Sequence, residues 1–355
     1  MPRWVKALLV SLLAVLVLGT GVVLLPSREQ PDPEPPFSET ARATAYAETR
    51  ALLDGASAAG SSPATVTLLE SQARALLAPA PASAAPSGAV SSAPSAPAGK
   101  AAFLGGLARS AAQRLADAGK SDGGTARLLA AVGTAQLLES GRLARAWGLP
   151  LPAQPALPES PAPSSSVLSS PALSSPAPSS SSPEASCPAG GSTAAPSTAT
   201  DDAGAPGPGE ALAAVVRAEQ EAVYIYQVAR TRLEGTAAAT AARDLAGHQD
   251  LLREAEALAR QLCTEPPPRE AGYRLPAGFA SQAAALGEQE SAALPAYGEL
   301  VALSDGGTRN WAIAGLLDSA RRMESWGTLS GALPGLSVDP AALPELPGST
   351  AAPAP

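Results

Sequence analysis

Three ionisable residues that could do chemistry lie on apolar helical stripes in the last part of the sequence. Glu219, His248 and Glu290 each interrupt a repeat of leucine, valine and alanine, and this repeat predicts that they face the interior of a helical bundle. His248 is the only histidine of the 355 residues. Ionisable groups inside a protein are costly unless they pair with one another or bind a ligand.

Two arginines offer one way to satisfy the carboxylates. Arg321 and Arg322 follow each other on the last predicted helix, and either one, turned inward, would pair with the glutamates. We therefore expect a buried structural network of Glu219, His248 and Glu290 with one of these arginines, and no cofactor. The alternative is a single iron, manganese or zinc ion held by the two carboxylates and the imidazole, with open coordination positions. The sequence identifies no catalytic residue.

The helices that position this cluster are predicted within a domain at residues 209–336. Apolar residues recur there with the spacing i, i+3, i+4, i+7 over four segments, which is typical of amphipathic helices. Gly235 ends the first helix and residues 266–268, all proline, stop the second. Pro295 lies inside the third helix and should kink it, and Thr308 is the predicted N-cap of the fourth. The short connections favour an antiparallel four-helix bundle in an all-α fold class.

A second helical region is predicted at residues 38–148, with a low-complexity loop at 79–99. It has the same order of helix, helix, loop, helix, helix, and its loop 121–125 (Ser-Asp-Gly-Gly-Thr) recurs at 304–308. The region is a degenerate copy of the C-terminal domain, unless Asp-Gly-Gly is simply a common helix-ending loop. Because its alanine-rich stripes alone bury little area, we expect this region to dock on the C-terminal domain rather than stand alone.

Proline, serine and alanine dominate three further segments. The chain contains 37 prolines and 32 glycines, many of them in stretches that cannot bury a core. These stretches predict a spacer at 27–37, a disordered linker at 149–208 and a disordered tail at 337–355.

The first 26 residues predict a signal anchor, that is, one N-terminal transmembrane helix. Arg3 and Lys6 precede an uncharged apolar run at 7–25, which is long enough to span a bilayer and lacks an evident cleavage site. A cleaved signal peptide is the alternative. Either way, the positive flank stays inside, so the body is expected to lie outside the cytoplasm, attached to the cell membrane by a single span.

Charge and cysteine content narrow the partners and the compartment. The net charge of −8 and the isoelectric point near 4.9 argue against nucleic acid as a partner, since nucleic acid requires a basic surface. The two cysteines, Cys187 and Cys263, could form a disulfide in an oxidising compartment, or remain two free thiols.

Several motifs of the C-terminal domain together resemble a known family. They are the run Ala218–Tyr226 (AEQEAVYIY), His248, Tyr273-Arg274-Leu275-Pro276, Glu288 or Glu290, Trp326 and Leu333-Pro334-Gly335. In their order and spacing they are similar to the ferritin-like "domain of unknown function 4439" group of actinobacteria. The resemblance covers about residues 210–336 and implies a ferritin-like four-helix fold in a cell-envelope protein, with no established activity.

The wider ferritin-like pattern also tests for a di-iron centre. Di-iron members use two glutamates and two Glu-x-x-His pairs, and Glu219, His248 and Glu290 match three of these six positions. Leu245 stands where the acid of one pair belongs, and the fourth helix has no histidine. Taken with the predicted anchor, this favours a membrane-anchored, extracytoplasmic ferritin-like module with a non-catalytic role, which would bind a partner in the cell envelope. The alternative is a metal-binding or redox protein that uses the reduced Glu/His site.

Overall fold

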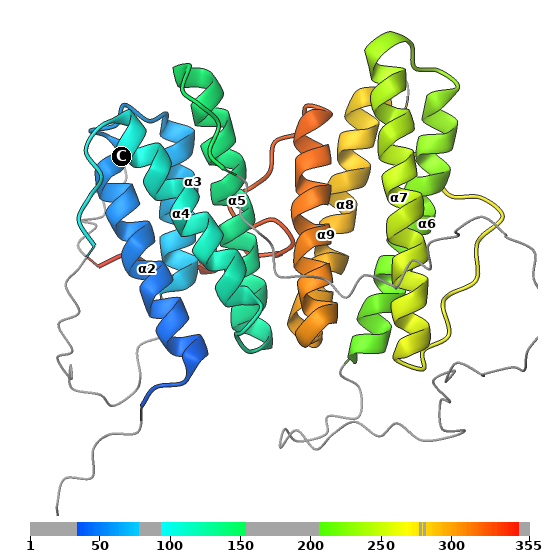
Figure 1. Ribbon diagram of the computed structural model, residues 1–355, viewed down its shortest axis with the longest axis horizontal. Coiled ribbons are helices and arrows are strands. Elements are labelled where there is room, and N and C mark those ends of the chain that lie inside the picture. Colours follow the sequence, from blue (N-terminus) through cyan, green and yellow to red (C-terminus); the bar gives the residue numbers. More distant parts are fainter. Residues whose placement is uncertain (1–33, 78–93, 154–205, 277–278, 280–281, 348–355) are drawn as a thin grey trace, which may run out of the picture. The chain divides into compact units, whose positions relative to one another are not determined.

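Every regular element that the structure describes is a helix. The computed structural model describes residues 34–77, 94–153, 206–276, 279 and 282–347, and this part of the chain contains eight α-helices, one short 3-10 helix and no strand (Figure 1). The α-helices are α2 (Phe37–Ala56), α3 (Pro63–Leu76), α4 (Lys100–Ala118), α5 (Gly123–Trp147), α6 (Pro208–Arg230), α7 (Gly235–Gln261), α8 (Gln282–Leu303) and α9 (Gly306–Ser325), and the 3-10 helix is η1 (Pro340–Ala342).

Local sequence signals explain where several helices begin and end. The side chain of Ser62 accepts a hydrogen bond from the backbone N–H of Thr65, and Pro63 takes the first helical position of α3. Asp122 caps α5 in the same way, and Gly148 closes α5 in the left-handed conformation with a φ of 64°. Such caps satisfy backbone groups that the helix itself leaves unpaired.

The helices pack in the same order in both halves of the chain. In the C-terminal half, α6 packs against α7 and α8, and α8 packs against α9. In the N-terminal half, α2 packs against α3 and α4, and α4 packs against α5. This shared order is what a degenerate duplication requires, and each half forms a helical bundle (Figure 1).

The two bundles share a core, because α5 packs against α8 and α9. The helices approach closely at Gly123, where a Cβ atom would lie 2.3 Å from the carbonyl oxygen of Ala302. Arg309 of α9 also reaches across and donates to the backbone carbonyl of Ser121. Residues from Phe37 onward accordingly belong to one compact unit. The contacts therefore agree with the expectation that the N-terminal helical region docks on the C-terminal domain.

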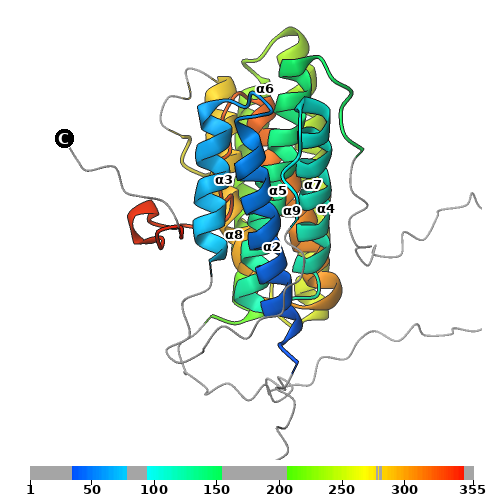
Figure 2. The same cartoon turned by 90° about the vertical axis from the view of Figure 1, so that its left-hand side faces the viewer.

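The segment after α9 runs back onto the N-terminal bundle. Gln72 donates to the carbonyl of Ala332 at 3.0 Å, and Arg127 donates to that of Gly335 at 2.8 Å. Arg74 of α3 donates to the carbonyl of Leu343 at 2.6 Å, and the segment with η1 lies beside α3 (Figure 2). Residues 337–347, which the sequence assigns to a disordered tail, are instead held by such contacts because the arginine satisfies their carbonyl groups.

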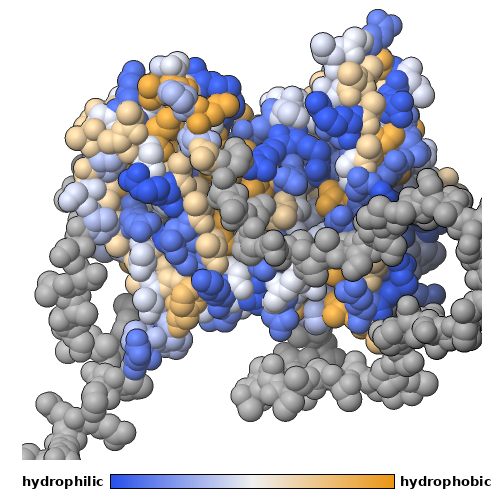
Figure 3. Space-filling model, viewed as in Figure 1, coloured by the Kyte–Doolittle hydropathy of each residue, from blue (hydrophilic) through white to orange (hydrophobic). Residues whose placement is uncertain are grey.

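None of the described helices is both long and apolar enough to cross a bilayer. The predicted anchor at 1–26, most of the spacer at 27–37 and most of the linker at 149–208 lie outside the described residues. On the face shown in Figure 3, hydrophilic side chains are interspersed with hydrophobic ones, as expected for a surface in contact with water.

Candidate functional site

Three helices bring the predicted ionisable residues together in the C-terminal bundle. Glu219 comes from α6, His248 from α7 and Glu290 from α8, and each of the three is at most 1% exposed. The Nδ1 atom of His248 lies 2.8 Å from a carboxylate oxygen of Glu219, and its Nε2 atom lies 2.8 Å from one of Glu290. The imidazole therefore bridges the two carboxylates.

Helix α9 adds one of the two candidate arginines to this site. Arg322 points inward, and its Nε donates to Glu290 at 3.1 Å. Arg321 instead pairs with Asp318, one turn earlier on α9, and its side chain is 36% exposed. Consecutive helical residues point about 100° apart, so only one of two neighbouring arginines can face the core. The site therefore contains Arg322, and Arg321 is not part of it.

Three hydroxyl groups that the sequence analysis did not assign to the site complete it. Tyr226 donates to Glu290 and Tyr297 donates to Glu219, each at 2.7 Å. Ser319 of α9 donates to the second carboxylate oxygen of Glu290 at 2.9 Å. Tyr226 and Tyr297 stand seven residues after Glu219 and Glu290, so each lies on the same helical stripe as one of the glutamates. A buried tyrosine hydroxyl needs a partner, so both could have been found from the sequence. Ser319 gives no comparable signal.

Each carboxylate oxygen of the site accepts at least one hydrogen bond. One carboxylate oxygen of Glu219 is hydrogen-bonded to His248, and the other accepts a hydrogen bond from Tyr297. One oxygen of Glu290 is hydrogen-bonded to His248, Tyr226 and Arg322, and the other accepts a hydrogen bond from Ser319. Buried charges are stable only when their hydrogen-bonding groups are satisfied in this way. The exception in this network is one terminal nitrogen of Arg322, which is buried and has no hydrogen-bond partner among the described residues.

The electrostatics of the site favour its charged form. Burial alone would lower the pKa of His248, but the carboxylates of Glu219 and Glu290 outweigh this effect and raise it to about 9. Burial would raise the pKa of Glu290, but His248 and Arg322 hold it at about 2. Two carboxylates thus face one imidazolium and one guanidinium, and these four charges balance. Asp244, which is partly buried, interacts with Arg322 and Glu290 from outside this set.

Burial and the neighbouring carboxylates also act on the two tyrosines. They raise the pKa of Tyr226 and that of Tyr297 well above the ordinary range. Both hydroxyls therefore remain protonated and donate to the glutamates.

These shifts predict that stability depends on pH. The pKa of His248 is raised from 6.5 to about 9, so its contribution is complete below pH 6.5 and is lost as the pH rises through 9. The pKa of Glu290 is lowered from 4.5 to about 2, so its contribution is present above pH 4.5 and is lost as the pH falls through 2. We expect a stability plateau between these limits and a loss of about 3 kcal/mol from the His248 contribution on the alkaline side.

Urea unfolding followed by circular dichroism across this range measures the effect. The alkaline decline should disappear in a His248→Gln variant, because glutamine does not titrate. An unfolding free energy that stays level from pH 6.5 to 9 in the wild type would mean that folded His248 is not an imidazolium.

The arrangement does not present a preformed metal site. Within the described part of the chain, no group of three or more His, Cys, Asp or Glu residues is arranged to hold a metal ion. Metal–nitrogen and metal–oxygen bonds are about 2.0–2.2 Å long, and the metal must meet a nitrogen lone pair. Both nitrogens of His248 instead face carboxylate oxygens directly at 2.8 Å. A metal could bind Glu219, His248 and Glu290 only after these contacts separate and the ring loses a proton.

One predicted disulfide residue is described outside this site. Cys263 follows α7 and is disulfide-bonded, and its φ of 53° is in the left-handed region that non-glycine residues seldom adopt. Cys187 is the only other cysteine of the sequence and lies outside the described residues.

Fold and site together define an all-helical bundle protein with a buried, charge-balanced Glu–His–Arg network. Residues 211–338 match the family model of domain of unknown function 4439 (DUF4439), which confirms the resemblance seen in the sequence. The match covers the segment that forms α6 to α9, about a third of the chain. No curated protein and no solved structure matches the chain.

Proposed function

We propose that this chain is a membrane-anchored, extracytoplasmic module that binds a partner protein of the cell envelope and does not catalyse a reaction. Its C-terminal bundle is ferritin-like in this proposal. Two features support the ferritin-like assignment: the four helices α6 to α9 with short first and third connections, and acidic or histidine side chains at three of the six di-iron positions.

The observation that carries the non-catalytic role is that both ring nitrogens of His248 and all four carboxylate oxygens of Glu219 and Glu290 are hydrogen-bonded. A general base needs a free lone pair, access to substrate and a pKa near the working pH. Both nitrogens of His248 are hydrogen-bonded, its side chain is 1% exposed, and its pKa is raised to about 9. Such a network holds four helices together, because it links α6, α7, α8 and α9 through charge-assisted hydrogen bonds.

Location outside the cytoplasm has two supports. Arg3 and Lys6 before the apolar run at 7–25 favour an anchor whose charged end stays inside the cell. The disulfide bond of Cys263 favours an oxidising compartment, since cytoplasmic proteins seldom keep such bonds. The Pro/Ser/Ala-rich segments suit a tethered module that reaches a partner at some distance from the membrane.

The alternative is a metal-binding or redox protein, in which Glu219, His248 and Glu290 would hold one ion. Full-length protein is loaded separately with iron, manganese and zinc, desalted, and its metal content is measured by mass spectrometry. We expect wild-type protein and a His248→Ala variant to retain the same low content. In the wild type, His248 and Arg322 already pair with the carboxylates, and the variant lacks one of the three groups that would hold the metal.

An Asp250→Asn variant controls for metal held at the surface, because Asp250 is exposed and lies outside the network. About one equivalent of metal, kept in Asp250→Asn and lost in His248→Ala, would overturn the proposal in favour of a metalloprotein.

A further inference from the structure

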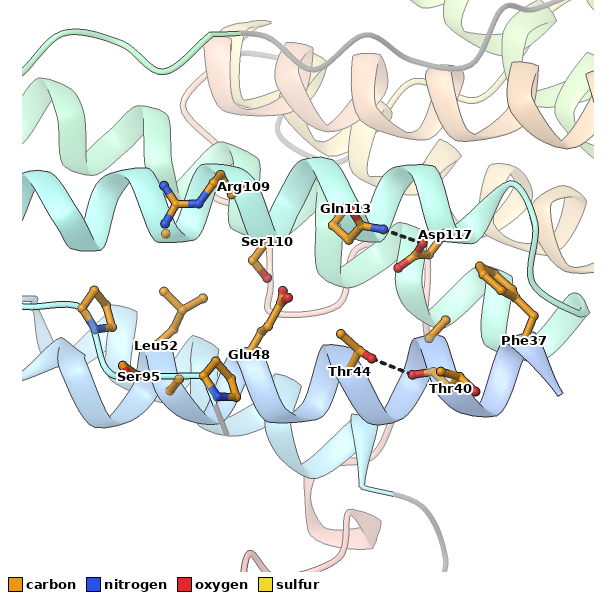
Figure 4. A pocket seen from close by; sticks show the side chains of 15 residues that line it. Phe37, Thr40, Thr44, Glu48, Leu52, Ser95, Arg109, Ser110, Gln113 and Asp117 are labelled. Carbon is orange, nitrogen blue, oxygen red and sulfur yellow. Dashed lines mark hydrogen bonds between the residues drawn. The ribbon is translucent and has the colours of Figure 1, made fainter. Parts of the chain in front are cut away.

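The N-terminal bundle has an elongated groove that the network in the C-terminal bundle does not involve. It lies between α2 and α4 and has a volume of about 530 Å³, within the range of small-ligand sites (Figure 4). Small residues on both helices line it, among them Ala41, Ala51 and Gly106. Small side chains leave room between two helices that larger ones would fill.

A proline-rich stretch of the chain already lies against one end of this groove. Pro94, Ser95 and Pro97 line it there. Pro97 packs so closely on α2 and α4 that a Cβ atom on Gly55 would lie 2.8 Å from its ring, and one on Gly106 would lie 3.9 Å from it. The groove therefore accepts extended chain with small or proline side chains at this end.

Two polar groups on α4 lack partners and face the groove. The hydroxyl of Ser110 is buried, with the residue 3% exposed, and it makes no hydrogen bond. Buried polar groups without partners are rare, and a ligand is one way to satisfy them. Arg109 forms no ion pair with any described residue and lies at the proline end, whereas Ser110 lies near the middle (Figure 4).

Negative charge increases along the groove away from Arg109. Glu48 lies near the middle, across from Ser110, and Asp117 lies towards the opposite end (Figure 4). Both carboxylates pair with the same buried guanidinium, that of Arg114, at 3.1 and 3.4 Å. Two carboxylates thus share one cation. The charges run from positive at Arg109 to negative at Asp117, eight residues along α4, which corresponds to about 12 Å.

We propose that this groove binds a short extended peptide of small and proline residues, with its carboxylate at Arg109 and its amino group at Asp117. The first and last Cα atoms of an extended five-residue peptide lie about 13 Å apart, which matches the separation of Arg109 and Asp117 along α4. The backbone of the peptide supplies the hydrogen-bond partner that Ser110 lacks. Because the groove is remote from His248, this proposal does not depend on whether the Glu–His–Arg network is catalytic or structural.

The test uses the full-length protein and the pentapeptide Ala-Pro-Ser-Ala-Pro with free termini. Isothermal titration should show saturable binding at one site. Amidation of the peptide carboxylate and acetylation of its amino group should each weaken binding by about fivefold or more, because each removes one charge-assisted contact.

Variants then locate the site. Arg109→Gln should weaken the free peptide to the level of the amidated one and abolish the effect of amidation. Arg217→Gln, an exposed substitution on α6, is the matched control and should leave binding unchanged. The proposal is overturned by an absence of saturable binding, by equal binding of capped and free peptides, or by equal effects of the two variants.

Discussion

Replacement of His248 by glutamine is expected to lower the free energy of unfolding by about 3–5 kcal/mol at neutral pH. His248 lies between two buried carboxylates, and its loss leaves Glu219 and Glu290 facing each other with Arg322 as the only cation. Removal of one member of a buried ion cluster is far more costly than loss of a surface pair, because an unpaired charge then remains in the core. Urea unfolding followed by circular dichroism measures the change.

Two further variants compare the stability loss caused by His248→Gln with the loss caused by breaking an exposed ion pair. Arg253→Gln breaks a pair with Asp250 whose side chains are 73% and 60% exposed, and it should change stability by less than about 1 kcal/mol. The double variant Glu219→Gln with His248→Gln should recover part of the loss, because it removes one of the two facing carboxylates. Equal, small effects of His248→Gln and Arg253→Gln would show that the network does not stabilise the bundle.

Replacement of Gly315 by alanine is expected to lower the free energy of unfolding by about 2–3 kcal/mol, although alanine favours helices. A Cβ atom at this position of α9 would lie 2.1 Å from the ring of Tyr297. That ring is fully buried, and its hydroxyl is fixed on Glu219 at 2.7 Å. The ring cannot move aside without breaking the network, so α8 and α9 must separate instead.

Gly247→Ala on α7 is the matched control for the helix preference itself. A Cβ atom at Gly247 meets nothing within 4 Å, so alanine there should stabilise the protein by up to about 1 kcal/mol. Thermal unfolding of both variants should shift the midpoints in opposite directions. A Gly315→Ala variant as stable as Gly247→Ala would mean that the contact between α8 and α9 is looser than the structure indicates.

The helices themselves were largely predictable from the sequence. The helical region predicted at 38–148 corresponds to α2 to α5, and the four-helix domain predicted at 209–336 corresponds to α6 to α9. The starts of helices were less certain. The fourth helix of the C-terminal bundle begins at Gly306 with Asp305 as its N-cap, not at Thr308 as the sequence predicts. Several polar residues in a row can each act as a cap, and local sequence alone does not choose among them.

The candidate site was predictable only in part. The apolar repeat around Glu219, His248 and Glu290 indicated that each would be buried. The apolar repeat did not show which of Arg321 and Arg322 faces the core, because few apolar residues define the buried face near the end of α9. The role of Ser319 was missed, since a serine beside aspartate is also typical of an exposed helix face.

The sequence by itself determined the all-helical fold, the burial of three ionisable residues and the resemblance to a family. These properties depend on local repeats of apolar residues, which act over a few turns of one helix. Only the tertiary structure decided which groups meet: the imidazole between two carboxylates, Arg322 on Glu290, the docking of α5 on α8, and the groove between α2 and α4. Such contacts depend on the rotation and spacing of whole helices, which are set by packing between residues far apart in the chain.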